Sequence, residues 1–209
     1  MGKKILEEVN RYYTAKIQKY GLTPQGVDWN STESQELRFS ILSEVLNFDD
    51  NYSVLDFGCG FGSMYDFYLR KNIGDFTYTG FDISSQMILE AKKKYGESEK
   101  INWLDGLGTE KHYDYVIASG IFNVKQDNSE ESWLNYILET LNQINQISTK
   151  GFSFNVLTKY SDKEYMRDYL YYADPLILFD YCKKNFSKYV VLKHDYPLYE
   201  FTIIVRKDV

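Results

Sequence analysis

The spacing of apolar residues predicts two helices within the first 50 residues. Apolar and aromatic positions recur at helical spacing over residues 3–20, and Gly21 and Pro24 end that run. A second helix is predicted after Asn30 and Ser31, because either side chain can cap a helix N-terminus. The apolar face of this second helix is formed by Leu37, Ile41, Val45 and Leu46.

From residue 52 onward, short β-branched or aromatic runs alternate with helical stretches. The predicted strands are 52–57, 76–82, 101–104, 113–119, 152–157, 189–194 and 200–205, and the predicted helices are 61–71, 84–95, 129–148 and 175–187. Strands that alternate with helices form a mostly parallel sheet through right-handed crossovers. Because only a short turn separates the last two strands, they form a hairpin. The pattern therefore predicts an α/β fold whose seven-stranded sheet is mostly parallel, with an antiparallel last strand.

Composition narrows the class of protein. The 209 residues are 44% hydrophobic and 26% charged, which is typical of one globular unit. The net charge of −6 and the lack of a basic run longer than residues 92–94 disfavour a nucleic-acid partner. Two cysteines and two histidines exclude a disulfide framework and a structural zinc site, so we expect no metal. With no long apolar run and no apolar signal core, we expect no membrane association and a cytoplasmic location.

A glycine-rich turn follows the first predicted strand. The stretch VLDFGCGFG places Gly58, Gly60 and Gly62 between a strand and a helix, where glycines permit a tight turn close to a ligand. Asp82 lies 20 residues after Gly62 at the end of the second strand. A carboxylate there can accept hydrogen bonds from both hydroxyls of a ribose. The two features together predict a site for a ligand that contains a nucleoside.

Two further acids bear on which nucleoside ligand binds. A dinucleotide site has the spacing GxGxxG and holds the pyrophosphate at a helix N-terminus. Here the spacing is GxGxG, and Asp56 lies two residues before the first glycine. A carboxylate at that point opposes a pyrophosphate but suits a ligand with an ammonium and a sulfonium group. Asp105, after the third strand, is placed to accept a hydrogen bond from the exocyclic amine of adenine.

These residues resemble the class I S-adenosylmethionine-dependent methyltransferases. VLDFGCGFG is similar to the first motif of that family, Asp82 to its ribose-binding acid and Asp105 to its adenine-side acid, while residues 113–119 are similar to its fourth strand. The resemblance covers residues 52–205 and implies a three-layer, Rossmann-like methyltransferase fold with S-adenosyl-L-methionine as cofactor. It divides the chain into an N-terminal helical cap, residues 1–50, which forms a lid, and a donor-binding domain, residues 51–209.

The resemblance also implies donor contacts. Gly58 and Gly60 approach the methionine part, Asp56 holds its ammonium, and Trp103 or Leu104 flanks the adenine. The connection between the third and fourth strands is too short for the usual helix, so the adenine side is expected to be more open. The predicted donor-binding residues are Asp56, Gly58, Cys59, Gly60, Asp82, Ile83, Trp103, Leu104, Asp105, Ser119 and Arg38. For Arg38, a contact with the donor carboxylate and an ion pair at the surface are both possible.

Fold alone does not identify the acceptor, so the remaining motifs must be interpreted as sites. The fourth strand is followed by SGIFN and not by the Asp/Asn-Pro-Pro-aromatic motif of enzymes that methylate base amines, and no Pro-Cys nucleophile is present. With the acidic charge, this favours O-methylation of a small polar metabolite such as a sugar or nucleotide-sugar. Transfer to a hydroxyl needs a base. His194 and Asp195, after the sixth strand, are the predicted catalytic residues, and a histidine in a surface turn is the alternative.

Aromatic residues make up 17% of the chain, and five of the 20 tyrosines lie in residues 159–174. A tyrosine suits an acceptor pocket because it combines a flat face with a hydroxyl. An amphipathic helix packed on the sheet is the alternative for this segment. The predicted acceptor-binding residues are Tyr13, Trp29, Asn123, Tyr171, Tyr172 and Tyr196. The tyrosines expected to face the cofactor mouth are Tyr12, Tyr13, Tyr160, Tyr165, Tyr169, Tyr171, Tyr172, Tyr196 and Tyr199.

Two other functions remain open on this sequence. The first is aminopropyl transfer to a polyamine on the same fold, which needs an acidic channel around Asp162, Glu164 and Asp168. The second is a module that binds the donor without chemistry. Turnover with the decarboxylated donor identifies the first, and failure to transfer a labelled methyl group identifies the second. No oligomeric state follows from the sequence.

Overall fold

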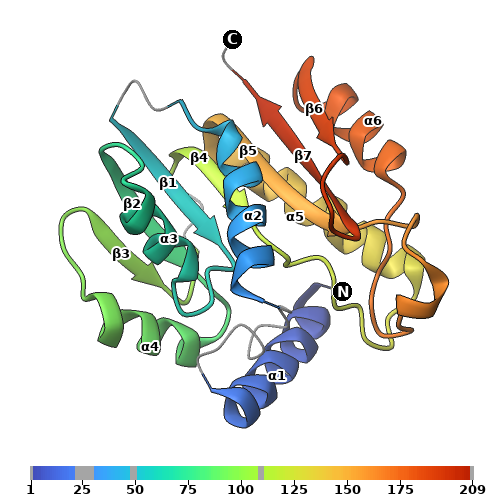
Figure 1. Cartoon of the computed structure of the whole chain (residues 1–209), viewed down its shortest axis with the longest axis horizontal. Helices are drawn as coiled ribbons and strands as arrows, with labels where there is room; N and C mark the ends of the chain where they lie inside the picture. Colours follow the sequence, from blue (N-terminus) through green and yellow to red (C-terminus); the bar gives the residue numbers. More distant parts are fainter. Residues whose placement is uncertain (1, 22–30, 48–50, 108–110, 208–209) are drawn as a thin grey trace.

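The strands form one mixed sheet at the centre of the molecule (Figure 1). The computed structural model describes residues 2–21, 31–47, 51–107 and 111–207. The strands are β1 (Tyr52–Phe57), β2 (Phe76–Phe81), β3 (Ile101–Leu104), β4 (Tyr113–Ala118), β5 (Ser148–Leu157), β6 (Tyr189–Lys193) and β7 (Glu200–Arg206). Their order is β3-β2-β1-β4-β5-β7-β6, and β7 is antiparallel to both of its neighbours. The predicted α/β fold and the reversed last strand are confirmed.

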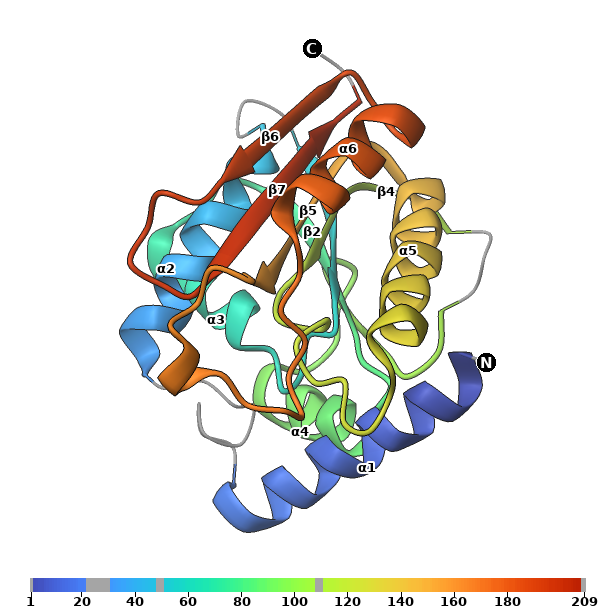
Figure 2. The same ribbon diagram turned by 90° about the vertical axis from the view of Figure 1, so that its right-hand side faces the viewer.

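Helices cover both faces of the sheet (Figure 2). Residues of α2 (Thr32–Leu42), α3 (Ser63–Lys71) and α4 (Ser85–Tyr95) share one apolar core with β1 and β2. Residues of α5 (Glu130–Ile147) and α6 (Pro175–Asn185) share the other core with β4, β5 and β7. Polar side chains fix where these helices begin: Ser31 accepts a hydrogen bond from the N–H of Ser34, and Asp174 accepts one from the N–H of Leu176.

The N-terminal helix α1 (Gly2–Tyr20) lies across the carboxyl ends of the parallel strands (Figure 2). Ile5 and Val9 near its start pack into the core on the α5 side, while Ile17 near its end packs against Phe61 and Met87. The helix therefore bridges the two faces of the sheet at the edge where open α/β folds bind ligands. This is the position predicted for the lid. The division of the chain at residue 50 stays a prediction.

Three segments bear on the sequence-based expectations. The described part of the β3–β4 connection, residues 105–107 and 111–112, contains no helix, which agrees with its length. Strand β5 begins at Ser148, directly after α5, and therefore four residues earlier than predicted. Residues 159–174 do not form the amphipathic helix considered above; they contain one short 3₁₀ turn, Lys163–Tyr165. None of the described helices combines the length and hydrophobicity of a membrane-spanning segment.

Backbone pairing explains why residues 159–174 are not helical. The N–H of Tyr171 donates to the carbonyl of Asn123 at 2.8 Å, and the N–H of Ala173 donates to the carbonyl of Leu157 at 2.8 Å. The N–H of Gln126 donates in turn to the carbonyl of Tyr169 at 3.0 Å. These bonds accompany isolated bridges beyond the ends of β4 and β5, and they satisfy backbone groups that a helix would otherwise pair. The segment is therefore tied to the loop between β4 and α5.

Candidate functional site

The glycine turn after β1 is folded onto the end of β2 by its own backbone. The N–H groups of Gly58 and Cys59 both donate to the carbonyl of Phe81, at 2.7 and 2.9 Å. The N–H of Gly62 donates to the carbonyl of Cys59 at 3.0 Å, and that of Gly60 donates to Asp82 at 2.9 Å. These four donors are therefore already bonded within the protein. A pyrophosphate cradle needs such donors to face the ligand, so the turn argues against a dinucleotide.

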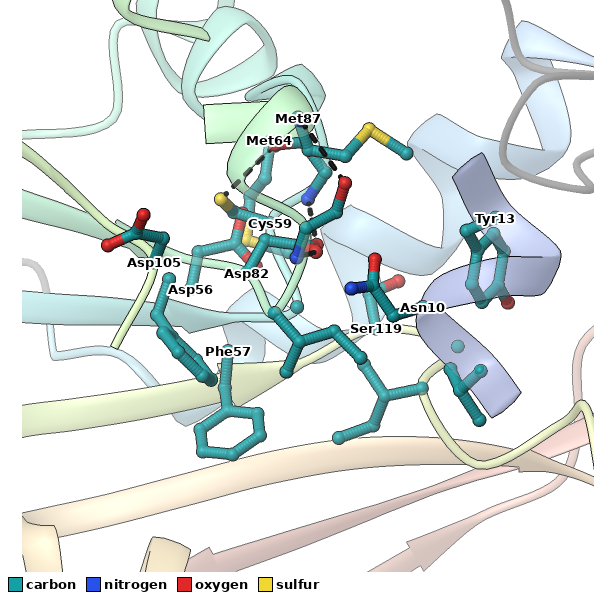
Figure 3. Close-up of a pocket in the computed structure, with 18 of the residues that line it drawn as sticks. Asn10, Tyr13, Asp56, Phe57, Cys59, Met64, Asp82, Met87, Asp105 and Ser119 are labelled. Atoms are coloured by element: carbon teal, nitrogen blue, oxygen red, sulfur yellow. Dashed lines mark hydrogen bonds between the residues drawn. The ribbon is translucent and has the colours of Figure 1, made fainter. Parts of the chain in front are cut away.

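Asp82 lies where β2 ends, directly beside the glycine turn (Figure 3). One carboxylate oxygen accepts from the N–H of Gly60, and the other accepts from the N–H of Ser84 at 2.8 Å. Burial raises the pKa of Asp82, and the two backbone hydrogen bonds oppose that rise. Each oxygen retains a lone pair. The two N–H groups thus hold the carboxylate in an orientation that can receive two ribose hydroxyls.

Asp56 lies beneath the turn and is only 2% exposed. The hydroxyl of Tyr78 donates to its carboxylate at 2.6 Å. Burial raises the pKa of Asp56 to about 7, the nearby charge of Asp82 adds to the rise, and the hydrogen bond from Tyr78 opposes it. A buried carboxylate of this kind is stabilised in its ionised form by a cationic ligand group.

We expect the affinity for S-adenosylhomocysteine to depend on the ionisation of Asp56. The ammonium of this ligand favours the carboxylate, so binding should tighten as pH rises toward 7 and level off above it. Below pH 7 the dissociation constant should rise by up to about tenfold per pH unit. Calorimetry from pH 6 to pH 8 measures this. Asp56→Asn should bind weakly with a flat profile, and an equally steep profile in that variant would assign the pH dependence to another group.

A cavity of about 310 Å³ opens between the glycine turn, the ends of β2, β3 and β4, and helix α1 (Figure 3). This volume lies at the lower end of the range for small-molecule sites. The cavity brings together these sequence-predicted residues: Asp56, Gly58, Cys59, Gly60, Asp82, Ile83, Asp105, Ser119 and Tyr13. They come from five separate segments of the chain. The sheet topology therefore assembles most of the predicted donor site at one point.

Trp103 and Leu104 do not line this cavity. The indole of Trp103 is 1% exposed and packs on the α3–α4 side, stacked on Tyr95 with ring centroids 5.7 Å apart. Its ring lies so close to Gly62 and Gly80 that a Cβ at either position would come within 2.6 Å of it. Leu104 packs against the opposite core because neighbouring strand residues face opposite sides. Trp103 thus supports the glycine turn from below and does not flank the cavity.

Arg38 is bound to Glu200 and does not line the cavity. Its Nε donates to Oε2 of Glu200 at 2.7 Å, and the two side chains are 9% and 1% exposed. The sequence alternatives were a donor contact and an ion pair at the surface. The structure shows an ion pair, but a buried one. On the same helix, Gln35 and Phe39 do line the cavity.

The predicted catalytic residues lie away from the cavity. His194 and Asp195 are exposed, and the ring of His194 lies 6.0 Å from those of Tyr160 and Phe201. They follow the edge strand β6, which β7 and β5 separate from β4. Three strand spacings of about 4.8 Å correspond to roughly 14 Å across the sheet. Neither side chain lines the cavity, so their predicted role as catalytic residues stays a prediction.

Four of the predicted acceptor-binding residues have structural partners outside the cavity. Asn123 accepts a hydrogen bond from the N–H of Leu157 at 3.2 Å, and Tyr171 is buried in the core. The hydroxyl of Tyr172 accepts from the N–H of Arg167, and the hydroxyl of Tyr196 bonds that of Thr202 at 2.9 Å. Trp29 lies outside the described residues. Of the nine tyrosines expected at the mouth, only Tyr13 lines the cavity.

Several cavity residues had no functional signal in the sequence. Helix α1 contributes Leu6, Val9 and Asn10, and the far wall includes Leu107, Ile121, Tyr136 and Thr140. Asn10 is the polar residue among the α1 positions that line the cavity, and only the structure identifies it. Ile121 meets Gly58 only through the tertiary fold, so no local pattern indicates it.

The cavity fits a donor that approaches the backbone closely. Gly58 has a φ of +85°, and a Cβ there would overlap the side chain of Ile121. The hydroxyl of Ser119 is buried at the end of β4 without a hydrogen-bond partner among the described residues. Buried hydroxyls normally form a hydrogen bond, so the unsatisfied hydroxyl of Ser119 is available to a ligand. The cavity thus offers the groups expected for S-adenosylmethionine: two acids, Asp82 and Asp56, with the glycine turn beside them.

Known proteins resemble this chain in both sequence and fold. The family described as "Methyltransferase domain" matches residues 55–148. The Mycobacterium tuberculosis protein Rv1506c, whose curated name assigns it provisionally to the methyltransferases, is 45% identical over 163 residues, covering 78% of this chain and 98% of that protein. N-methyltransferase NodS of Bradyrhizobium japonicum with S-adenosyl-L-homocysteine superposes with a TM-score of 0.68 at 11% identity, covering 95% and 97% of the two chains.

A further solved structure has nearly the same extent. Magnesium protoporphyrin IX methyltransferase of Synechocystis PCC 6803 with bound S-adenosylhomocysteine superposes with a TM-score of 0.66 at 15% identity, covering 99% of both chains. These two structures share the fold, while the 45% identity over nearly all of the mycobacterial protein shows common descent. Together with the acids and glycines of the cavity, the matches show that the chain belongs to the class I S-adenosylmethionine-dependent methyltransferases and is an enzyme of that family.

Proposed function

We propose that this methyltransferase acts on a small acceptor that carries no negative charge. The observation that carries the proposal is the charge of the cavity: Asp56, Asp82 and Asp105 line it, and no lysine, arginine or histidine does so among the described residues. The sulfonium and ammonium of the bound donor offset only part of this negative charge, and no protein cation in the described lining offsets the rest, so an acceptor with a phosphate would be repelled. Among the acceptors considered, this favours a neutral sugar-like or amine compound over a nucleotide-sugar.

For the donor, we propose that Asp82 binds the ribose, Asp56 the ammonium and Asp105 the adenine amine beside Ile83. The adenine ring then faces Leu107 and Ile121, in place of the predicted contact with Trp103. The donor carboxylate is assigned to the buried amide of Gln35, because the charge of Arg38 is already bound to Glu200. This assignment keeps Arg38 outside the donor site.

When bound, S-adenosylmethionine supplies an electrophilic methyl group on a sulfonium that departs as a neutral thioether. The protein therefore has to align the acceptor and exclude water. Tyr13 and Asn10 of α1 face the cavity and are placed to contact the acceptor (Figure 3). The side chain of Asn128 donates to Glu8 of α1 at 3.0 Å and so ties this helix to the loop before α5. This contact helps hold the proposed lid beside the mouth.

O-methylation through His194 stays a prediction that needs its own test, because the histidine lies outside the cavity. An amine acceptor supplies its own lone pair once it is deprotonated. A hydroxyl acceptor needs a base. Of the two structures compared above, which share the fold, one is named as an N-methyltransferase and one is named for a porphyrin substrate, which supports a small acceptor without fixing the atom that is methylated.

Transfer of a radiolabelled methyl group to a metabolite extract tests the proposal. The extract is separated by anion exchange into a retained anionic fraction and an unretained fraction, and each is incubated with the protein and labelled donor. We expect label in the unretained fraction. Label confined to the anionic fraction contradicts the charge argument, while donor binding without any transfer supports the non-catalytic module. Turnover with the decarboxylated donor would support aminopropyl transfer.

With an acceptor in hand, an unchanged rate in His194→Ala would exclude that residue as the base.

A further inference from the structure

We infer that Arg38, Asn155 and Glu200 form a buried polar chain that positions the Ser119–Gly120 turn against the donor. The inference rests on the proposed placement of the donor in this cavity. It assigns these three side chains as positioning residues, since none of them lines the cavity itself. The chain connects α2, β5 and β7 to the loop that follows β4.

The ion pair is the first link of this chain. Arg38 and Glu200 are 162 residues apart in sequence, and their 2.7 Å contact is almost fully buried. Removal of two charges from water is costly, so such pairs seldom increase stability over apolar residues of the same size. Its position is informative, because the same helix α2 contributes Gln35 and Phe39 to the cavity wall.

Asn155 is the second link. It is 0% exposed on β5, and the pairing of Asn155 with Thr202 and of Leu157 with Glu200 places it diagonally across from Glu200 on one face of the sheet. Burial raises the pKa of Glu200, and the positive charge of Arg38, which also donates a hydrogen bond to this carboxylate, opposes that rise. The Nδ2 of Asn155 and the Oε1 of Glu200 are both buried and make no hydrogen bond to a described residue, so the link between the amide and the ion pair is diagonal packing beside the carboxylate and not a hydrogen bond.

The other side of the Asn155 amide holds the turn. Its Oδ1 accepts a hydrogen bond from the N–H of Gly120 at 2.8 Å, in a fully buried contact. Gly120 has a φ of +73°, which only glycine adopts readily. Because the peptide unit is planar and trans, a fixed N–H of Gly120 fixes the carbonyl of Ser119 in the opposite direction, away from Asn155. Both residues line the donor cavity, so the orientation of this peptide sets the local shape of its wall.

Calorimetric titration with S-adenosylhomocysteine tests the chain. We expect Asn155→Ala and Glu200→Gln to weaken binding by at least tenfold. Ser153→Ala is the matched control: Ser153 is two residues away on the same strand, equally buried, and its hydroxyl donates to the carbonyl of Leu42 at 2.8 Å without reaching the turn. This control should lose thermal stability but keep wild-type affinity. If Asn155→Ala does not fold, the paired replacement Arg38→Met with Glu200→Leu provides the same test.

Hydrogen exchange of the Gly120 amide provides a readout that a merely structural role would not change. It should accelerate at least tenfold in Asn155→Ala and Glu200→Gln and stay unchanged in Ser153→Ala. Wild-type affinity in both test variants, or a loss of affinity in the control that matches theirs, would overturn the inference. Failure of the wild-type protein to bind S-adenosylhomocysteine would instead overturn the proposed donor site, so the two failures are distinguishable.

Discussion

Asp82→Ala is expected to weaken binding of S-adenosylhomocysteine by about 100-fold or more. The substitution removes both proposed contacts with the ribose hydroxyls, and hydrogen bonds to a charged group contribute about 1.5–3 kcal/mol each. It also releases the N–H groups of Gly60 and Ser84 that the carboxylate holds at 2.9 and 2.8 Å, so the glycine turn loses its anchor. Calorimetry of the purified variant measures the affinity, and circular dichroism checks that it is folded.

Asp66→Ala is the matched control for this experiment. Asp66 is a partly exposed acid on α3 that pairs with Arg70 at 3.1 Å and does not line the cavity. Exposed ion pairs contribute little to stability, so this variant should bind S-adenosylhomocysteine as the wild type does. Asp82→Asn retains one acceptor oxygen, so its affinity for S-adenosylhomocysteine should lie between those of Asp82→Ala and Asp66→Ala. A dissociation constant within about threefold of the wild-type value for Asp82→Ala would remove Asp82 from the ribose site.

The donor-facing part of the cavity could be predicted because its residues are close in sequence. Strand β1, the glycine turn, β2 and Asp82 lie within 31 residues, from Tyr52 to Asp82, and each has a local signature. The mostly parallel pairing and the reversed last strand follow from the alternation of strands and helices and from the short turn before β7, whereas the strand order comes from the structure. For this part of the chain, local pattern and tertiary arrangement agree.

The rest of the site depends on contacts between segments that are distant in the sequence. Arg38 was chosen as a donor ligand from its position on α2, but its partner Glu200 lies 162 residues away. The family resemblance implies that Trp103 or Leu104 flanks the adenine, but side chains alternate along a strand and the ring of Trp103 faces the α3–α4 core. No periodicity in the sequence reports either contact.

The tyrosines illustrate a different limit. Their number and clustering suggested a wall of the acceptor site, yet residues 159–174 are held by backbone pairing with the loop after β4. Tyr171 turns into the core, while Tyr160 and Tyr165 are exposed. The backbone of residues 159–174 is therefore joined to the loop after β4, and some tyrosines of this segment lie on the surface. Composition indicates where aromatic side chains are frequent, but the direction of each side chain depends on the backbone around it.

Gly58→Ala is the second substitution for which we expect a large effect. At a φ of +85° an L-residue is strained by roughly 1–2 kcal/mol, and the new Cβ would overlap the Cγ2 of Ile121, which adds about 1–3 kcal/mol. We expect the free energy of unfolding to fall by roughly 2–5 kcal/mol. Because the turn and Ile121 both line the cavity, affinity for S-adenosylhomocysteine should fall at least tenfold. Thermal unfolding and calorimetry measure the two effects.

Strain and overlap can be separated with variants that this chain offers. Gly96 has a φ of +73° and open space around its Cβ position, so Gly96→Ala has backbone strain without a clash and should leave donor binding unchanged. Ile121→Ala removes the overlapping atom, because the next nearest atom, Ile121 Cβ, lies at an ordinary 3.7 Å. In the Ile121→Ala background, Gly58→Ala should therefore lower the free energy of unfolding by about 1–3 kcal/mol less than it does in the wild type, because the overlap is absent. A double-mutant cycle measures this coupling directly. Equal effects of Gly58→Ala in both backgrounds would show that the close approach of Ile121 is not what requires a glycine at this position.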